Sequence, residues 1–332
     1  MSLPEWARAF GAPLFAATIR TTPQDFQVTE ELGFEFTGDG EHDYLWIEKT
    51  GANTEWVARQ LARFADVPAR DVGYAGLKDR HAVTRQWFSV PRWNAPDWNA
   101  LDVEGVKVLD VQRHNKKLRK GAHKSNSFVI VLRGDGLHRY AEAIEERVQL
   151  IREQGVPNYF GEQRFGRDGN NVSLADAWAS GKRLPRHKRS LAISTARSFM
   201  FNNYLDTRVR AGTWNAIVPG DKANLDGTGS VFDVENVDAE IERRYEDMDI
   251  HPAGELAGDG STGSNEAWIA ALGKARVEPG TRSLRLRVSD LSCKIGEESI
   301  ELEFTLGRGA FATSVLREIV LTRRSTPIPA VS

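Results

Sequence analysis

The sequence predicts an α+β fold, because segments with strand character lie near both ends of the chain and helical segments fill its middle. Tyr44 to Lys49 is a short apolar run rich in strand formers, and Ile300 to Leu306 alternates apolar with polar residues. Ser190 to about Arg210 lies between them and has helical periodicity. We therefore expect the last strands to return to the first sheet and the middle of the chain to form an insertion.

In the N-terminal half, strands and helices are expected to alternate. The strands are predicted at Asp25 to Leu32, Tyr44 to Lys49, Gln86 to Val90 and Ser127 to Arg133, the last of them buried on both faces. Asn53 and Thr54 can cap a helix that buries Val57, Leu61 and Phe64, since these three residues share one face. A second helix is predicted from Tyr140 to Arg152.

The C-terminal half begins with glycine-rich turns at Phe160 to Asn171, after which Ser190 can cap the long helix. Gly254 to Ser264 is rich in glycine and predicts a flexible loop. The remaining elements are expected as strands at Leu284 to Val288 and Ile300 to Leu306 and as a helix at Ala312 to Leu321.

Length and composition indicate a globular protein of more than one domain. A chain of 332 residues exceeds the size at which a single core usually stops growing. Cys293 is the single cysteine, so the sequence supports neither an intramolecular disulfide nor a zinc-binding cysteine cluster. A secretory signal and an apolar segment of membrane-spanning length are also absent from the sequence. These features predict a cytoplasmic protein without a membrane partner.

Charge is distributed unevenly, although the net charge is only −2. Residues 111–134 contain no acid and seven basic residues: Arg113, Lys116, Lys117, Arg119, Lys120, Lys124 and Arg133. A second acid-free cluster contains Lys182, Arg183, Arg186, Lys188 and Arg189. Residues 204–268, by contrast, carry 14 acids and 5 bases. The basic stretches predict a surface that attracts a polyanion, unless they are solvated surface runs.

The segment from Val72 to Phe88 places many functional side chains in a predicted loop between a helix and a strand. Its centre, Lys78-Asp79-Arg80-His81, puts one carboxylate among three possible cations. His81 is itself a candidate general base, because histidine titrates near neutral pH. Taken without further information, the segment is also compatible with a solvated turn in which Asp79 caps the backbone.

This loop resembles the signature of the TruD family of tRNA pseudouridine synthases, through Gly76-Leu77-Lys78-Asp79 and His81-Ala82-Val83-Thr84-Arg85-Gln86. Other stretches similar to the family follow in the expected order: Pro23 to Val28, His114 to Phe128, Asn158 to Gly166, Ser194 to Asn202 and Phe311 to Glu318. The resemblance spans nearly the whole chain. It implies a pseudouridine-synthase catalytic domain with a mixed or antiparallel sheet, formed by residues 1–156 and 300–332, and an inserted α+β TRUD domain of residues 157–299.

The same resemblance implies which residues form the site. Asp79 is the catalytic carboxylate, and the substrate-binding residues are Arg20, Phe26, Lys78, Asn126, Phe128 and Phe311. The phenylalanines would hold a uracil that has left the base stack, and Arg20 would lie beside Asp79 and keep its carboxylate ionised. Ser125 precedes Asn126 where the family has glycine, which leaves the local backbone shape open.

The implied reaction converts a uridine of tRNA, at position 13 in the D arm, to pseudouridine. It needs neither an organic cofactor nor a metal, because the bond from C1′ to N1 is broken and remade to C5 without net redox change. Asp79 acts either as a nucleophile at C1′ or as the base that removes the C2′ proton. The residues expected to bind the RNA backbone are Arg113, Lys116, Lys117, Arg119, Lys120 and Lys124. We expect a monomer, with no protein partner.

Two other function classes fit parts of the sequence. A catalytically inactive RNA-binding module would use the same basic stretches, but the intact Lys78-Asp79 pair favours an enzyme. A hydrolase would pair Asp79 with a second carboxylate, Glu162 or Asp168, and would release free uracil.

Overall fold

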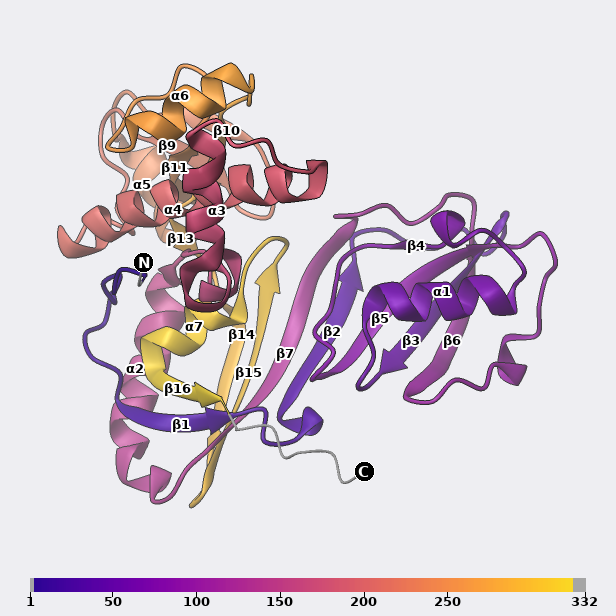
Figure 1. The fold of residues 1–332 in the computed structure, drawn as a ribbon. Helices are drawn as coiled ribbons and strands as arrows, with labels where there is room; N and C mark the ends of the chain where they lie inside the picture. Colours follow the sequence, from indigo (N-terminus) through magenta and orange to yellow (C-terminus); the bar gives the residue numbers. More distant parts are fainter. Residues whose placement is uncertain (1–2, 325–332) are drawn as a thin grey trace. The chain divides into compact units, whose positions relative to one another are not determined.

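The computed structural model describes residues 3–324, which divide into two compact units (Figure 1). The first, the sheet unit, contains Leu14–Val148, Ser289–Gly309 and residues 320–324. The second, the helix-rich unit, contains residues 3–13, Gln149–Val288 and residues 310–319. Over the described residues, no helix is both long enough and apolar enough to cross a membrane.

A mixed sheet of ten strands, counted over residues 3–324, forms the sheet unit. Its strands are β1 (Phe15–Ile19), β2 (Phe26–Leu32), β3 (His42–Lys49), β4 (Gly73–Tyr74), β5 (Val83–Pro91), β6 (Val106–His114), β7 (His123–Arg133), β14 (Ser289–Ile295), β15 (Ser299–Gly307) and β16 (Val320–Arg324). The main path runs β14-β15-β7-β2-β5-β3-β6. β2 pairs with β5 in parallel, whereas β15 pairs with β7 in antiparallel register along its whole length. The predicted α+β fold and the return of the last strands to the first sheet are therefore confirmed.

Helix α1 (Thr54–Phe64) packs on one face of this sheet. Val57 and Leu61 are fully buried there with Leu45 and Ile47 of β3, which share the face because strand residues two apart point the same way. Phe64 was expected in the same buried stripe, but its side chain is 36% exposed. It lies at the end of the helix and contacts the edge of the core through the Trp98 ring, with the ring centroids 5.5 Å apart.

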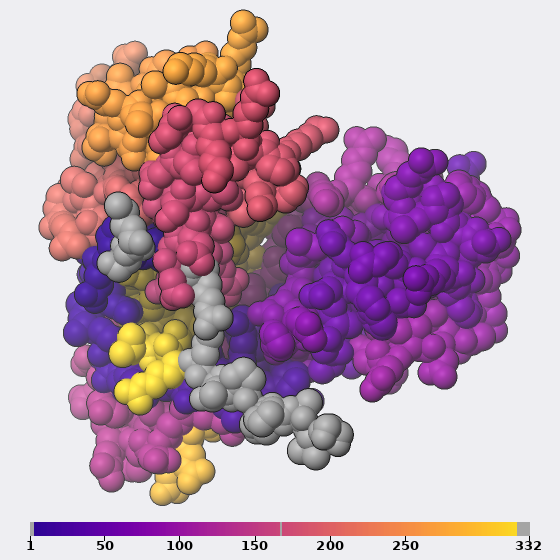
Figure 2. Space-filling view, in the orientation of Figure 1, coloured from indigo at the N-terminus to yellow at the C-terminus, as the bar shows by residue number. Residues whose placement is uncertain are grey.

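The helix-rich unit combines helices with two small sheets. Its helices of eight or more residues are α3 (Asn170–Ala179), α4 (Arg186–Arg210), α5 (Ala239–Glu246), α6 (Glu266–Lys274) and α7 (Ala312–Ile319), and α2 (Ala141–Gln154) leads into it. β9 (Lys222–Leu225), β10 (Val231–Asp233), β11 (Ile250–Leu256) and β12 (Gly280–Ser283) form one antiparallel sheet, and β8 (Val156–Pro157) pairs with β13 (Arg285–Leu286). Figure 2 shows the chain from α3 to α6, coloured pink to orange, as one continuous mass.

Several predicted elements differ in the structure. The long helix starts at Arg186 rather than at Ser190, because the Pro185 carbonyl already accepts a hydrogen bond from the Arg189 N–H at 2.9 Å, one turn before the predicted cap. The stretch from Leu284 to Val288 contains β13, which pairs with β8 and does not join the large sheet. Leu321, predicted as helical, belongs to strand β16. β7 is buried at Phe128, Ile130 and Leu132, but its other face is only half-buried.

The compact units do not share the bounds of the predicted domains, residues 1–156 with 300–332 and residues 157–299. The units change at 148/149 and 288/289, and residues 3–13 and 310–319 join the helix-rich unit. Residues 325–332 of the predicted catalytic domain lie outside the described residues. The domain assignment stays a prediction.

Candidate active site

Asp79 lies in the loop between β4 and β5, inside the sheet unit. Its Oδ2 is 2.9 Å from Nη2 of Arg20, and its Oδ1 accepts a hydrogen bond from the backbone N–H of His81 at 2.9 Å. The Asp79 side chain is 29% exposed. The carboxylate is thus held by a cation and a backbone donor on one side and remains open to solvent, which is the arrangement that a reacting carboxylate needs.

Arg20, directly after β1, reaches Asp79 from an unusual backbone conformation. Its φ of 59° is in the left-handed region, which costs a residue other than glycine about 1 kcal/mol. The guanidinium carbon lies 4.2 Å from the centroid of the Phe26 ring, so the side chain is sandwiched between an aromatic face and a carboxylate. The predicted contact between Arg20 and Asp79 is present, and Phe26 orients it.

The Lys78 side chain is buried against strand β2. Its Nζ lies 2.7 Å from Oε2 of Glu30 on β2, where the side chains are 6% and 0% exposed. The backbone N–H of Trp87 donates to the other Glu30 oxygen at 3.2 Å. Burial raises the pKa of Glu30 above its ordinary value, because desolvation outweighs the attraction of Lys78. Lys78 therefore anchors the loop through a buried ion pair.

Lys49, at the end of β3, binds the backbone of the loop that carries Asp79. It is fully buried, and its Nζ donates to the carbonyl oxygens of Ala52 at 2.9 Å and Asp79 at 3.1 Å. Burial lowers the pKa of Lys49 to about 8, although the Asp79 charge opposes the shift. The position of the Asp79 backbone depends on this ammonium group.

A buried hydrogen-bond chain fixes the start of the same loop. The Thr54 hydroxyl, at the beginning of α1, donates to Oε1 of Gln86 at 2.9 Å and accepts from the Lys78 N–H at 3.0 Å. Gln86 Nε2 donates to the Gly76 carbonyl at 3.1 Å. The first helix and strand β5 thus define the path of the chain just before Asp79.

Phe26, which contacts Arg20, and Phe128 lie on the adjacent strands β2 and β7. Their ring centroids are 6.3 Å apart in an edge-to-face arrangement, and Phe128 stacks on Phe304 at 5.3 Å. Asn126 precedes Phe128 by two residues on β7 and pairs in register with Glu30. Within residues 3–324, its buried Oδ1 has no hydrogen-bond partner. An unpaired buried acceptor is costly, which points to a ligand donor at this position.

The predicted RNA-backbone residues are spread over β6, β7 and the intervening loop of residues 115–122. Lys116, Lys117, Arg119 and Lys120 are exposed in this loop. The loop backbone is nevertheless fixed, because the Gly121 N–H donates to the Ala75 carbonyl at 2.7 Å. It therefore presents these cations beside the segment that carries Asp79.

Several cations of this set also make contacts inside the protein: Nζ of Lys117 donates to the Arg70 carbonyl at 2.5 Å, and Nζ of Lys120 lies 5.7 Å from the centroid of the Tyr74 ring. Nη2 of Arg113 donates to the Gly40 carbonyl at 2.7 Å. Lys124 lies 3.6 Å from Glu31, and both side chains are largely exposed.

Phe311 belongs to the helix-rich unit, just before α7. Its ring centroid lies 6.1 Å from that of Phe160, and the Arg282 guanidinium carbon is 5.8 Å from its centroid. Glu162 and Asp168, the alternative second carboxylates, belong to the same unit. In the described chain, the side-chain contacts of Asp79 are a cation and an N–H donor, and no three His, Cys, Asp or Glu side chains converge to hold a metal ion.

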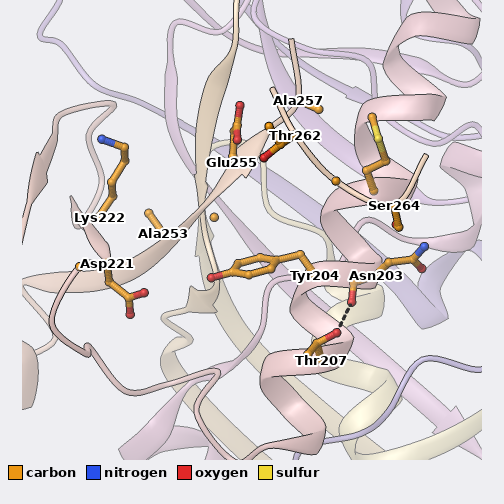
Figure 3. Close-up of a pocket in the computed structure, with 14 residues that line it drawn as sticks. Asn203, Tyr204, Thr207, Asp221, Lys222, Ala253, Glu255, Ala257, Thr262 and Ser264 are labelled. Carbon is orange, nitrogen blue, oxygen red and sulfur yellow. Dashed lines mark hydrogen bonds between the residues drawn. The ribbon is translucent and has the colours of Figure 1, made fainter. Parts of the chain in front are cut away.

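A hollow of about 530 Å³ lies within the helix-rich unit (Figure 3). Tyr204 extends from α4 toward Asp221, and Arg208 ties the two together with contacts of 3.1 Å to the phenol and 2.9 Å to the carboxylate. None of the predicted site residues lines this hollow. This hollow therefore does not mark the predicted reacting group, and the convergence of charges around Asp79 is the stronger indicator.

Sequence reasoning missed Glu30, Lys49 and Gln86 as parts of the site. A signal was present for the first two. Glu30 continues the buried face of Phe26 and Val28 on β2, and Lys49 continues the buried face of β3. A charged residue that extends a buried apolar face needs a polar or charged partner inside the protein. Its place in the pattern therefore marks it as a candidate for a buried ion pair or hydrogen bond.

Known proteins are similar to this chain over the residues that form the site. The family model for tRNA pseudouridine synthase D (TruD) matches residues 9–175 and 170–319. A protein named tRNA pseudouridine synthase D from Methylococcus capsulatus is 45% identical over 94% of this chain and 93% of its own length. One of the same name from Hydrogenovibrio crunogenus is 39% identical over 96% and 97%.

A solved structure from Methanosarcina mazei, described as a candidate tRNA pseudouridine synthase D, aligns with a TM-score of 0.73. It covers 96% of this chain and 98% of its own, at 19% identity, so it supports the fold alone. The family model and the similarity to full-length relatives agree, and the chain belongs to the tRNA pseudouridine synthase D (TruD) family.

Proposed function

We propose that this protein is an isomerase that converts a uridine of tRNA to pseudouridine, with Asp79 as its reacting carboxylate. The observation that carries the proposal is the carboxylate itself, held by Arg20 and the His81 N–H on a loop that Lys49 and Lys78 anchor. The substrate follows from family membership, because the relatives are named for this reaction on tRNA.

The reaction breaks the bond between C1′ and N1, turns the uracil, and forms a bond between C1′ and C5. The proton on C5 is lost and N1 gains one, so atoms and electrons balance without a co-reactant. Asp79 serves this scheme in either of two ways: its oxygen attacks C1′, or it removes the C2′ proton. Both routes need the carboxylate to be held toward the sugar, and the Arg20 guanidinium contacts it at 2.9 Å.

Base recognition is assigned to Phe26, Phe128 and Asn126 of the sheet unit, and a part for Phe311 of the helix-rich unit stays a prediction. A flipped uracil offers one strong donor, N3–H, and the unpaired Oδ1 of Asn126 is an acceptor that suits it. The aromatic rings would supply apolar surface to the base. Lys78 is reassigned in this proposal from substrate contact to structural anchor, since its ammonium is engaged by Glu30.

Position 13 in the D arm is the proposed target within tRNA, by resemblance to the family. A monomer working in the cytoplasm is proposed as well, because the reaction as written uses one Asp79 and the single cysteine suits a reducing compartment.

The test is incubation of the purified protein with unmodified tRNA, followed by mapping of pseudouridine. Conversion at one uridine, with RNA mass unchanged, supports the isomerase. Release of uracil would support the hydrolase instead, and binding without any change in the RNA would support the inactive RNA-binding module.

Arg20→Ala is expected to lower kcat by about 10- to 100-fold, because the carboxylate loses the group that orients it. Arg20→Lys should show a smaller loss of kcat, because it keeps the charge but not the planar stacking on Phe26. A variant that only weakens tRNA binding, with kcat at saturating tRNA unchanged, would make Arg20 an RNA contact.

Changing Lys116, Lys117 and Lys120 to alanine is expected to weaken tRNA binding and to reduce the slope of log K against log salt by about 2, since each lost phosphate contact removes about 0.7 to 0.9. The matched control changes three exposed cations outside the loop, Arg59, Arg63 and Lys107. Equal slopes for the two triple variants would remove the loop from the RNA-binding surface.

A further inference from the structure

Five cations lie between the end of α3 and the first turn of α4 in the helix-rich unit. This cluster, called the α4 patch, contains Lys182, Arg183, Arg186, Lys188 and Arg189. The first two lie in the connection after α3, and the other three lie in the first turn of α4. All five side chains are exposed.

The α4 patch has no acid to neutralise it. Residues 177–205 contain no Asp or Glu, and none of the five cations forms an ion pair with any residue between 3 and 324. Other cations of the same unit behave differently: Arg208, Arg210, Lys222, Arg243 and Arg244 each pair with an aspartate. In an acid-rich unit, this segregation leaves a concentrated positive surface.

The placement of the patch is unfavourable for the helix that carries it. Backbone dipoles make the start of a helix positive, so acidic residues are stabilising there and cations are not. α5 follows this rule with Glu240 and Glu242, and α6 follows it with Glu266. The first turn of α4 contains no acid. Folding alone therefore gives no reason for the three basic residues, whereas an anionic partner would.

We propose that the α4 patch binds phosphates of the tRNA backbone, as a second contact surface in addition to the basic loop of the sheet unit. The inference rests on the proposed function, which supplies a polyanionic substrate. Exposed arginine and lysine side chains without internal partners suit phosphate oxygens and read no base sequence. The patch positions tRNA and takes no part in the chemistry at Asp79.

The experiment compares Lys188→Gln/Arg189→Gln with a control that has the same charge change in the same unit, Arg243→Gln/Lys274→Gln. Affinity for unmodified tRNA is measured across a salt series, and steady-state rates are measured beside it. The patch variant should bind about tenfold more weakly, with a salt slope lower by about 1.5, and should raise KM while kcat at saturating tRNA is retained. Its thermal midpoint should equal or exceed that of the parent.

Each outcome bears on the proposal in a defined way. If the parent modifies tRNA and the patch variant binds it with the parent's affinity and slope, the patch is overturned while the proposed function stands. If the parent neither binds nor modifies tRNA, the proposed function and the role of the α4 patch are both contradicted. If the patch variant loses the parent's binding to phosphatidylglycerol vesicles while its tRNA binding is unchanged, the RNA assignment is overturned in favour of an anionic lipid surface.

Discussion

Asp79→Asn is expected to reduce pseudouridine formation by about 10⁴-fold or more, while folding and tRNA binding are retained. The carboxamide has nearly the same shape as the carboxylate, and its oxygen can still accept the His81 N–H. It is, however, a poor nucleophile and a poor base, so neither route at C1′ or C2′ remains open. The measurement is pseudouridine mapping in tRNA after single-turnover incubation, with tRNA affinity determined in parallel.

A matched control is available eight residues earlier. Asp71 is a partly exposed carboxylate whose nearest cation, Arg70, lies at 3.9 Å. Asp71→Asn makes the same chemical change just outside the loop and should leave the rate within about twofold of the parent, as expected for a surface substitution. Turnover by Asp79→Asn at a rate close to that of Asp71→Asn would end the proposed mechanism.

The large elements of the fold were predictable, because their apolar patterns match the geometry that they adopt. β15 and β7 alternate buried and less buried residues, and each was identified from that alternation. The short β13 was misplaced for a physical reason. A two-residue ladder has almost no periodicity of its own, and the partner β8 lies more than 120 residues away in sequence. Pairings of that range depend on tertiary packing and leave no local signal.

The residues of the site also differ in how far they could be predicted from the sequence. Asp79 and Arg20 were identified through resemblance, and the structure places them in contact. The buried residues that position them were not identified: Glu30 and Lys49 each continue a buried face of a strand, but the partner that each binds is set by tertiary packing and leaves no local signal. Phe311 falls in the other compact unit, so its part in a shared pocket stays a prediction.

The second large effect is expected on stability and concerns the ion pair of Lys78 and Glu30. Lys78→Met keeps the length of the side chain but removes the charge that compensates Glu30, whose side chain is fully buried. Breaking one partner of a buried pair typically costs about 3–5 kcal/mol, because the other charge is left without compensation. The free energy of unfolding in urea should fall by about that amount. Adding Glu30→Gln should recover much of it, since the amide oxygen can still accept from the Trp87 N–H.

The pH dependence distinguishes charge from packing. Burial already raises the pKa of Glu30 above its value in the unfolded chain, and loss of Lys78 removes an attraction that opposed the shift. Between the unfolded and native pKa values, native Lys78→Met binds a proton that the unfolded chain does not, so its stability falls as pH rises through this window. The deficit relative to the parent should therefore be greatest above the native pKa of Glu30 and should shrink as the pH is lowered toward about 4.5, the ordinary value for glutamate. In the double variant with Glu30→Gln this dependence should vanish. A deficit that is equal at every pH would mean that Lys78 acts through packing alone, and the buried charge of Glu30 would no longer explain how the loop is held.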